Sequence, residues 1–409
     1  MVESVKAKEQ MVRQHRHISQ RKFRRVALII ESGAAPRRRM LTGVARYMHE
    51  HEPWEIYLKP SNVEKSLGQW LRDWHGDGII VALQETDTDF VVGQKLPVVD
   101  MVGVLRHEGV PLVHANDRSI GRVGAEHLME RGFRNLGFCE YPEWFFSVHR
   151  REGFDQALAQ HQIKTRVHRM PPPVAGRGGP KRWERQQREL SEWLLALPKP
   201  AGVMASTDLM GQQVLEACQR LEIKVPEEVA VVGADNDEPI CNVCFPPLSS
   251  VIINDDQRGY QAAAVLDRLM NGEAAPTEPM LIEPGGVACR ASTDILAIDD
   301  EALATALRFI RDHACEQIGV DDVVDAVPLS RSVLQRRFRK AVGRSVNDEI
   351  IRVRLNRAIE LLSETSLELK AIALKAGFGT PSYMGAVFRQ KLGTTPGSYR
   401  DRAPAATAH

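Results

Sequence analysis

The C-terminal quarter of the chain contains an internal repeat. A shift of about 50 residues superimposes Ala326 on Ala376, Ser332 on Ser382, Phe338 on Phe388, Arg339 on Arg389 and Gly343 on Gly393. In each copy, a short helical pattern, a tight turn and a second, more basic helical pattern follow one another. This order is typical of a helix-turn-helix unit, whose second helix enters the major groove of DNA. The sequence therefore predicts two copies of one DNA-binding device.

The spacing of apolar and turn residues predicts helices at 321–326 and 330–341 in the first copy, at 369–376 and 381–391 in the second, and at 346–363 between them. Ser330 and Thr380 stand at the start of the second helices, where a hydroxyl can accept a hydrogen bond from an otherwise unpaired amide. Pro381 suits the first turn of a helix. The long middle helix is expected to join the two copies rigidly.

The outward faces of the second helices carry the candidate contacts to DNA. The positions expected to pack inward are Val333, Leu334 and Phe338 in the first copy and Tyr383, Met384, Val387 and Phe388 in the second. The outward positions, from which side chains can reach base edges or phosphates, are Ser330, Arg331, Ser332, Gln335, Arg336 and Arg339, and then Thr380, Ser382, Gly385, Ala386, Arg389 and Gln390. The alternative is a pair of ordinary amphipathic helices with solvated charges. The coincidence of repeat, turn residues and charge favours DNA.

The distribution of charge supports that hypothesis. The net charge is only +1, but residues 329–409 carry about 15 lysines and arginines against 6 acidic residues, and residues 1–40 carry about 11 against 3. The middle of the chain is correspondingly acidic. Because neutralisation of phosphates dominates binding to nucleic acids, basic ends on an acidic middle favour a nucleic-acid partner.

Before the repeat, short apolar runs alternate with amphipathic helical patterns. The runs have the length of buried parallel strands and lie at 26–30, 54–58, 78–83, 97–100, 135–139, 201–205 and 229–233. The helical patterns lie at 38–50, 118–131, 150–161, 181–197, 208–221 and 255–271. This alternation predicts doubly wound α/β sheets with helices on both faces. So many units exceed one ordinary sheet, and we expect two lobes.

The change of pattern near residues 293–300 predicts a domain boundary. With 409 residues the chain can hold two or three domains. We expect a basic extension over 1–24, a two-lobed α/β domain over 25–294, an all-α domain over 295–402 and a tail over 403–409. No apolar run approaches the ~20 residues of a membrane span, and the first two dozen residues lack the apolar stretch of a secretory signal. A cytoplasmic protein is therefore expected.

The cysteines and histidines predict no metal site. The six cysteines are scattered without a disulfide framework, so reduced thiols are expected. Cys241 and Cys244 have C-x-x-C spacing, but no second pair of ligands stands nearby. No cofactor is predicted.

Polar residues follow several of the predicted strands. Ligands of open α/β sheets bind beyond the carboxyl ends of the strands, where this chain has Glu31, Asn116, Asp117, Asp208, Asp235 and Asn236. Arg150 opens a predicted helix after an aromatic loop that begins at Trp144. Carboxylates, amides and a guanidinium can bond the hydroxyls of a sugar while an aromatic ring stacks on its apolar face. Each polar residue can equally serve as a helix cap.

The C-terminal part resembles a known family. The residues that carry the resemblance are Ile372-Ala373, Gly377-Phe378, Ser382-Tyr383, Phe388-Arg389, Gly393, Thr395-Pro396 and Tyr399-Arg400. Together they resemble the signature of the AraC/XylS-type DNA-binding domain, over roughly residues 302–402. The resemblance implies two helix-turn-helix units in successive major-groove segments on one face of the DNA. Met384 stands where the family commonly has an aromatic residue, a variation in packing.

The N-terminal part resembles the LacI-type, periplasmic-sugar-binding fold and, within it, the xylose operon regulators. The resemblance lies in segments such as Val26 to Glu31, Asn116 to Gly121, Arg150 to Phe154 and Gly233 to Asp237. It implies that Asn116, Arg150, Asp208 and Asp235 contact an effector. The roughly 24 residues before the first strand are too few for the amino-terminal helix-turn-helix of ordinary LacI proteins, which places DNA binding at the other end.

One departure from the family pattern concerns the effector. Where xylose regulators usually have a Tyr before an Arg, this chain has Ala35-Pro36-Arg37-Arg38-Arg39. Arg38 keeps the family's Arg position and the Tyr is lost. Three arginines near a pocket favour an acidic sugar or a phosphate. They also fit a solvated helix start, which is the preferred interpretation.

The resemblances imply a transcription regulator that is controlled by a sugar, such as xylose, bound between the lobes. Activation is the expected output. The expected partners are double-stranded promoter DNA, a sugar effector and a second copy of the chain, with RNA polymerase as a further candidate. Another sugar or a sugar acid remains an alternative effector. A sugar-modifying α/β enzyme is an alternative of a different class, but it leaves the basic repeat without a role.

Overall fold

The computed structural model describes residues 23–30, 33–59, 71, 74–82, 91, 96–103, 109–171, 180–295, 300–365 and 367–402. The predicted contact residue Glu31, the tail over 403–409 and residues 1–22 of the predicted extension lie outside these ranges. Within them, no helix combines the length and the apolar character that crossing a bilayer requires.

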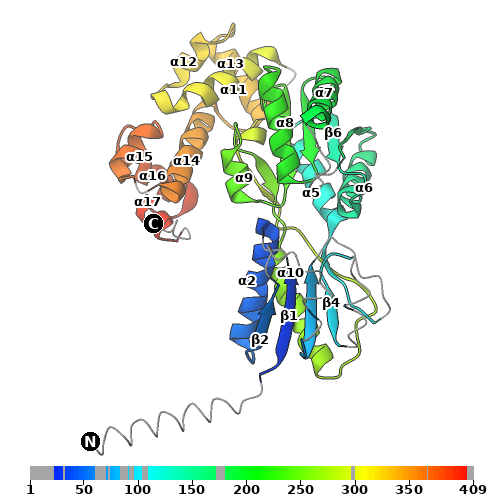
Figure 1. Ribbon diagram of the computed structural model, residues 1–409. Coiled ribbons are helices and arrows are strands. Elements are labelled where there is room, and N and C mark those ends of the chain that lie inside the picture. The colour runs from blue at the N-terminus through cyan, green and yellow to red at the C-terminus, as the bar shows by residue number, and fades with distance from the viewer. Residues whose placement is uncertain are drawn as a thin grey trace, which may run out of the picture.

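The first lobe, at the bottom of Figure 1, is built on a parallel sheet with strand order β2-β1-β3-β4. Its strands are β1 (Arg25–Ile30), β2 (Glu55–Leu58), β3 (Gly78–Ala82) and β4 (Val98–Asp100). A bridge between Asp100 and Leu112 leads on to the parallel pair β5 (Val113–Ala115) and β11 (Met280–Ile282). The helices α2 (Ala35–Glu50) and α10 (Asp255–Met270) pack together against this sheet. Because β1 and β3 are apolar along their length, both of their faces can be buried.

The second lobe holds a six-stranded sheet of order β12-β10-β9-β8-β6-β7. In chain order its strands are β6 (Asn135–Glu140), β7 (Arg166–Arg169), β8 (Ala201–Ala205), β9 (Val229–Ala234), β10 (Ser249–Val251) and β12 (Val287–Ala288), with only β12 antiparallel. The helices are α5 (Asp117–Glu130), α6 (Phe145–Ala159), α7 (Pro180–Ala196), α8 (Asp208–Arg220) and α9 (Glu238–Val243). The chain passes between the lobes near residues 116, 252–254 and 283–286, so three segments of the chain connect them (Figure 1).

The helical domain lies beside the second lobe (Figure 1). After the short helix η1 (Ala291–Thr293) it contains α11 (Glu301–His313), η2 (Ala314–Glu316), α12 (Val320–Asp325), α13 (Arg331–Val342), α14 (Val346–Glu364), α15 (Leu369–Lys375), α16 (Pro381–Leu392) and α17 (Pro396–Arg402). One core surrounds Leu334 and Phe338 of α13, and another surrounds Met384 and Phe388 of α16. The two copies of the repeat therefore form two small cores, and α14 contributes to both.

Most predicted elements occur in the structure. Each of the seven predicted strands has a counterpart whose ends agree within one residue. The strands β5, β7 and β10 were not predicted because none of them contains two adjacent apolar residues, so they form no apolar run. The predicted aromatic loop before Arg150 is wrong: α6 already begins at Phe145, and its N-cap residue Trp144 makes no side-chain capping bond that could mark the start.

Two helix pairs cross where glycine lets their backbones touch. A Cβ atom on Gly121 of α5 would lie 1.7 Å from the carbonyl oxygen of Arg150 in α6, and one on Gly43 of α2 would lie 1.9 Å from that of Asp256 in α10. No side chain fits at either crossing. The close approach of α5 and α6 fixes the position of the Arg150 backbone, from which its side chain extends into the space between the lobes.

Replacing Gly121 by Ala should lower the free energy of unfolding of the α/β domain by about 1–3 kcal/mol, because the added Cβ forces the two helices apart. Urea unfolding followed by tryptophan fluorescence measures the change. A Cβ atom on Gly385 of α16 would meet no heavy atom within 4 Å, so Gly385→Ala is the control and should cost nothing. Equal losses in both variants would contradict the crossing argument.

Candidate functional site

A cavity of about 310 Å³ lies between the two lobes. We call it the inter-lobe pocket. Of the predicted effector contacts, Asp117, Trp144, Arg150 and Asp235 line it. The sequence did not single out most of the other lining residues, which include Arg37, Met40, Val102, His114, Phe145, Phe146, Thr207 and Arg258. Both lobes contribute to the wall, so a ligand in the pocket would contact both.

Arg150 is the centre of the polar wall. Its side chain is only 6% exposed, and its guanidinium donates to Asp117 Oδ1 at 3.0 Å, to Asp235 Oδ1 at 3.2 Å and to the carbonyl oxygen of Ser206. The ring of Phe146 lies 5.0 Å from the guanidinium carbon, close enough for a cation–π contact. A buried guanidinium needs such partners, and here they come from α5, from the residue after β8 and from the turn after β9.

The two carboxylates beside Arg150 differ in their proton affinity. Burial alone would raise the pKa of Asp117, but the hydrogen bond from His114 and the charge of Arg150 outweigh it and lower the pKa. Burial is the largest cause that raises the pKa of Asp235, to about 7; the nearby carboxylates Asp208 and Asp255 contribute to that rise, and the charge of Arg150 opposes it. Asp117 therefore stays ionised, while Asp235 can hold a proton near neutral pH.

The other predicted effector contacts do not line the pocket. Asn116 caps α5, its side chain accepting from the amide of Ser119 at 3.2 Å and donating to Glu283 at 2.6 Å. Asp208 accepts from the hydroxyl of Ser250 at 2.6 Å and from the amide of Asp237 at 2.7 Å. Burial raises the pKa of Asp208. The contacts of Asp208 hold the turn after β9 in place, and those of Asn116 hold the start of α5, so both residues support the wall from behind.

That turn is strained at two residues. Asp235 has φ of 118° and Asn236 has φ of 48°, values that side chains other than glycine rarely adopt. The amide of Asn236 donates to Ser250 at 2.9 Å, and its side-chain oxygen accepts from Arg290 at 2.9 Å. Strain of this kind persists only where neighbouring contacts impose it. Here it brings the carboxylate of Asp235 to the pocket while Asn236 faces Arg290.

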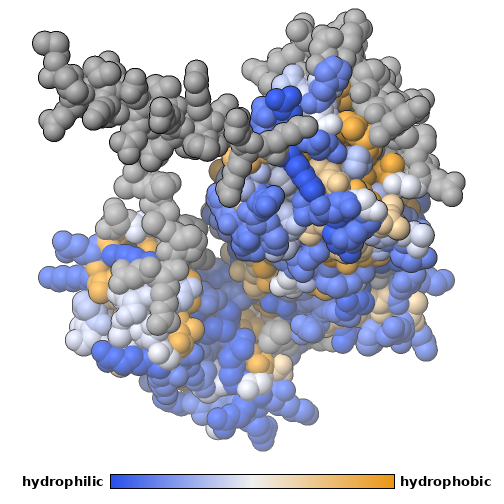
Figure 2. Space-filling view, turned by 90° about the horizontal axis from the view of Figure 1, so that it is seen from below, coloured by the Kyte–Doolittle hydropathy of each residue, from blue (hydrophilic) through white to orange (hydrophobic). Residues whose placement is uncertain are grey.

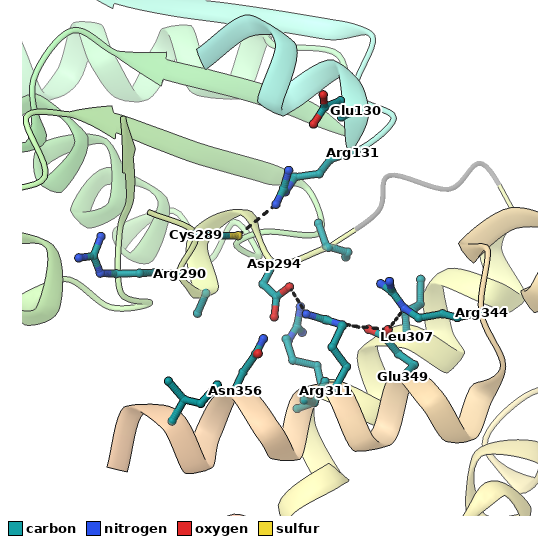
Figure 3. Close-up of a pocket in the computed structure, with 15 residues that line it drawn as sticks. Glu130, Arg131, Cys289, Arg290, Asp294, Leu307, Arg311, Arg344, Glu349 and Asn356 are labelled. Carbon is teal, nitrogen blue, oxygen red and sulfur yellow. Dashed lines mark hydrogen bonds and ion pairs between the residues drawn. The ribbon is translucent and has the colours of Figure 1, made fainter. Parts of the chain in front are cut away.

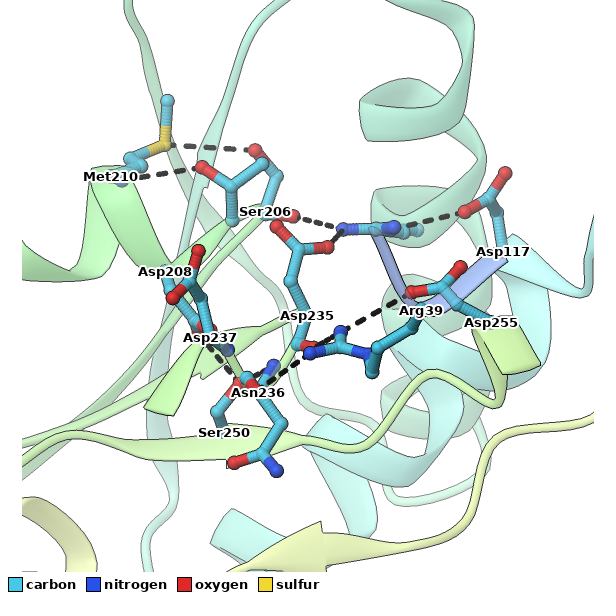
Figure 4. A network of polar contacts seen from close by, with 12 residues as sticks. Arg39, Asp117, Ser206, Asp208, Met210, Asp235, Asn236, Asp237, Ser250 and Asp255 are labelled. Atoms are coloured by element: carbon cyan, nitrogen blue, oxygen red, sulfur yellow. Dashed lines mark hydrogen bonds and ion pairs between the residues drawn. The ribbon is translucent and has the colours of Figure 1, made fainter. Parts of the chain in front are cut away.

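The three arginines at the start of α2 have different surroundings. Arg39 crosses between the lobes: it donates to the carbonyl oxygens of Asp235 and Asn236 and pairs with Asp255 at 3.2 Å (Figure 4). Arg38 is exposed and donates to the carbonyl oxygen of Gly33 at 2.8 Å. Arg37 lines the pocket. The interpretation of these arginines as a solvated start of a helix therefore holds for Arg38 but not for Arg37 and Arg39.

The end of the α/β domain is bonded to the helical domain. Arg352 of α14 pairs with Asp294 at 2.7 Å and with Glu349 at 2.7 Å. Glu349 also pairs with Arg344, two residues after the end of α13 (Figure 3). Arg311 of α11 pairs with Glu227, in the turn before β9. These pairs surround a second cavity of about 580 Å³ that both domains line.

Consecutive contacts connect the pocket to this boundary. Asn236, next to Asp235, bonds Arg290, and Arg290 lies on the same short segment as Asp294. Ser292 and Thr293, between them, bond Val231 and Ser249 of the second sheet. A rearrangement of the turn at 235–236 therefore bears on the segment that holds α14.

The predicted DNA contacts lie on an exposed surface of the helical domain. The residues exposed as predicted are Ser330, Arg331, Ser332, Gln335, Arg336 and Arg339 of the first unit and Thr380, Ser382, Ala386, Arg389 and Gln390 of the second; Gly385 is half-buried. Arg331 pairs with Asp321 of α12. Tyr383 was predicted to pack inward and is instead 44% exposed, its ring resting edge-on against Phe378.

The repeated residues have matching roles in the two units. Gly343 and Gly393 end α13 and α16 in the left-handed conformation, with φ of 77° and 67°. Thr380 caps α16 by accepting from the amide of Tyr383 at 3.3 Å, whereas Ser330 stands at the N-cap of α13 without that bond. The two units are thus copies of one architecture.

Seen from below, the described surface is mostly hydrophilic, with apolar residues in small patches (Figure 2).

Comparison with known proteins agrees with both domains. A periplasmic binding protein-like domain matches residues 125–293, and a helix-turn-helix domain matches residues 323–402. The xylose operon regulatory protein of Escherichia coli strain K12 is 32% identical over 394 residues, covering 93% of this chain and 97% of that protein. The protein of the same name from Haemophilus influenzae is 27% identical over 389 residues, covering 92% and 98%.

A solved structure gives the same result. The structure of a xylose-binding transcription activator matches with a TM-score of 0.71 and 30% identity, covering 94% of this chain and all of that one. The predicted fold class and the predicted resemblance are confirmed by these matches.

The raised pKa of Asp235 predicts a pH-dependent effect of Asp235→Asn. Between about pH 4 and about pH 7 the folded chain holds a proton on Asp235 that the unfolded chain has released, so ionisation costs the wild type stability as the pH rises. The variant cannot ionise, and its free energy of unfolding relative to wild type should therefore rise by about 1–3 kcal/mol over that range. Urea unfolding at both ends of the range measures it; a difference that does not change with pH would contradict the assignment.

Proposed function

The chain belongs to the family of the xylose operon regulators, and on that basis we propose that its two helix-turn-helix units bind promoter DNA under the control of a monosaccharide in the inter-lobe pocket. The observation that carries the proposal is the pair of matching units with exposed second helices, fused to an α/β domain whose pocket both lobes line.

DNA binding is supported by the surface of α13 and α16. Gln335, Arg336 and Arg339 extend outward from α13, and Arg389 and Gln390 from α16. Arginine bonds guanine edges and phosphates, and glutamine bonds adenine. Because α14 contributes to the cores of both units, their spacing is fixed, as reading two successive segments of one groove requires.

The sugar effector is supported by the composition of the pocket wall. Asp117, Arg150 and Asp235 offer acceptors and donors for hydroxyls, and Trp144 and Phe145 offer apolar surface. A cavity of about 310 Å³ is of the size that binds small molecules. The names of the relatives make D-xylose the first sugar to test.

Control of DNA binding is supported by the contacts that run from Asn236 through Arg290 to Asp294 and Arg352. A ligand shifts an equilibrium only if it binds the two arrangements with different affinity. A sugar that contacts both Arg37 of one lobe and Asp235 of the other meets that condition whenever the lobes move. Activation is the proposed output, with RNA polymerase as candidate partner.

Two further parts of the proposal concern assembly and location. We propose a homodimer because paired half-sites on DNA require two copies, and a cytoplasmic location because DNA is the target. The enzyme hypothesis has no comparable support, since the relatives are regulators and the basic repeat would have no role in it. We propose that three predicted effector contacts respond to the effector indirectly, by supporting the pocket wall from behind: Asn116, Asp208 and Asn236.

Replacing Gln335 or Arg389 by Ala should weaken binding to the operator by about 1–3 kcal/mol, because each removes a proposed base contact. Fluorescence anisotropy with labelled promoter DNA measures the affinity. Arg337→Ala is the matched control, since Arg337 lies on α13 but pairs with Asp300 at 3.3 Å. Unchanged affinity in both test variants would refute these contacts.

Replacing Asp235 by Ala should abolish the thermal stabilisation given by the effector, because a hydroxyl acceptor in the pocket is lost. Differential scanning fluorimetry against a panel of pentoses, hexoses and sugar acids detects the shift in Tm. The exposed Asp256 of α10 supplies the control variant Asp256→Ala, and DNA affinity without effector should be preserved in both. A shift in Tm that survives in Asp235→Ala would place the binding site elsewhere.

A further inference from the structure

The side chain of His114 lies between two hydrogen-bond acceptors. His114 belongs to β5 and lines the inter-lobe pocket, where it is 9% exposed. Its Nδ1 lies 2.9 Å from the carbonyl oxygen of Met101, and its Nε2 lies 3.1 Å from Oδ2 of Asp117. The ring of Phe145 lies beside it, with the two ring centroids 5.6 Å apart. Both ring nitrogens are therefore engaged within the protein.

These two contacts fix the number of protons that His114 and Asp117 hold together. A carbonyl oxygen can only accept, so Nδ1 must carry a hydrogen. A neutral imidazole has a single N–H, and its Nε2 would then be an acceptor that faces another acceptor, the carboxylate. The contact at 3.1 Å is favourable only with a proton between Nε2 and Oδ2. The pair therefore holds one proton more than a neutral histidine beside an ionised aspartate.

The surroundings of Asp117 place that proton on His114. The other carboxylate oxygen, Oδ1, accepts from Nε of Arg150 at 3.0 Å, an interaction that favours the ionised carboxylate. Burial opposes the ionisation of Asp117, but the hydrogen bond from His114 and the charge of Arg150 outweigh it and lower the pKa of Asp117. His114 is then an imidazolium that donates from both nitrogens, and Asp117 is a carboxylate held at both oxygens.

The orientation of Asp117 matters because this residue is one of the proposed partners of a sugar hydroxyl. A carboxylate has about four acceptor sites on its two oxygens, and His114 and Arg150 use one on each oxygen. With the remaining sites Asp117, which lines the pocket, can accept from a ligand hydroxyl. Without the second proton on His114, Nε2 and Oδ2 would repel each other, and the carboxylate would leave this position.

We propose that His114 is a positioning residue of the effector site: it carries a proton on both ring nitrogens, and in this form it orients Asp117 toward the sugar. The inference deepens the proposed function and rests on it, since the pocket is there proposed to bind a monosaccharide. It follows that the pocket binds the sugar more weakly once His114 has lost its second proton, so the affinity that depends on His114 falls as the pH rises.

Other charged groups of the pocket bear on this pH dependence. Asp235 gains its charge near neutral pH, since burial raises its pKa to about 7. It adds a pH dependence of its own, so only a comparison with a variant of His114 isolates the part that belongs to His114. The remaining charged or titratable side chains around the pocket are Arg37 of α2, Asp117 of α5, Arg150 of α6 and Arg258 of α10, together with Asp100 of β4, which precedes Met101, and His149 of α6, which contacts Phe145.

Nitrogen NMR of the full chain, labelled in its histidines, tests the protonation directly. At about pH 7, both ring nitrogens of His114 should give the chemical shift of a protonated nitrogen. The signal should be absent from His114→Gln, which assigns it. If that variant does not fold, Asp117→Asn assigns the signal instead, because the His114 ring should become neutral once the carboxylate is lost. A wild-type signal with one protonated and one unprotonated nitrogen overturns the inference.

Calorimetric titration with D-xylose tests the positioning role. At about pH 6, His114→Gln should bind the sugar about tenfold or more weakly than wild type, because a charged hydrogen bond to Asp117 is lost. At about pH 9, where wild type has lost the same bond, the two dissociation constants should be nearly equal. His161→Gln is the matched control, since His161 is an exposed histidine shortly after the end of α6. It should match wild type at both pH values.

The outcomes separate this inference from the proposed function. A ratio of the two dissociation constants that is the same at both pH values overturns the positioning role and leaves a sugar-binding pocket. If D-xylose does not bind wild type, the same comparison is made with whichever of L-arabinose, D-glucose and D-galactose binds. If none of these sugars binds at either pH, the proposed function of the pocket fails, and the positioning role fails with it.

Discussion

The buried guanidinium of Arg150 is the interaction on which the ligand pocket depends. It needs carboxylate partners, and the fold supplies them from separate elements: Asp117 at the start of α5 and Asp235 after β9. Its position depends in turn on the crossing of α5 and α6, where Gly121 lets the backbones touch. The packing of α5 against α6 and the electrostatics of the pocket therefore depend on each other, because moving α6 would separate the buried guanidinium of Arg150 from its carboxylate partners.

The same arrangement gives the pocket access to the helical domain. The turn at Asp235 and Asn236 ends β9, and the side chain of Asn236 bonds Arg290 on the last segment of the α/β domain. Four residues later, Asp294 pairs with Arg352 of α14, the helix that contributes to both helix-turn-helix cores. The connection is short, because the segment from Arg290 to Asp294 contacts both the second sheet and α14 of the helical domain.

The sequence predicted the elements better than the site. Buried strands and the duplicated units produce local patterns, which is why Phe338 with Phe388 and Gly343 with Gly393 can be paired by their spacing alone. Which polar residue at a strand end faces the pocket depends on a backbone turn, and the positive φ of Asp235 has no local signal. Arg258 was missed because its surroundings come from α2 and α10, far apart in sequence.

The central claim is that the pocket and the DNA-binding surface share one equilibrium, and reciprocity tests it most directly. If the effector changes operator affinity by some factor, operator DNA must change effector affinity by the same factor. Titrating the effector that stabilises the chain into free protein and into the operator complex, at one salt concentration, gives both dissociation constants. The account predicts that they differ by the factor seen in the DNA titrations. The account is contradicted if the effector binds free protein and the operator complex with equal affinity and also leaves the affinity for the operator unchanged.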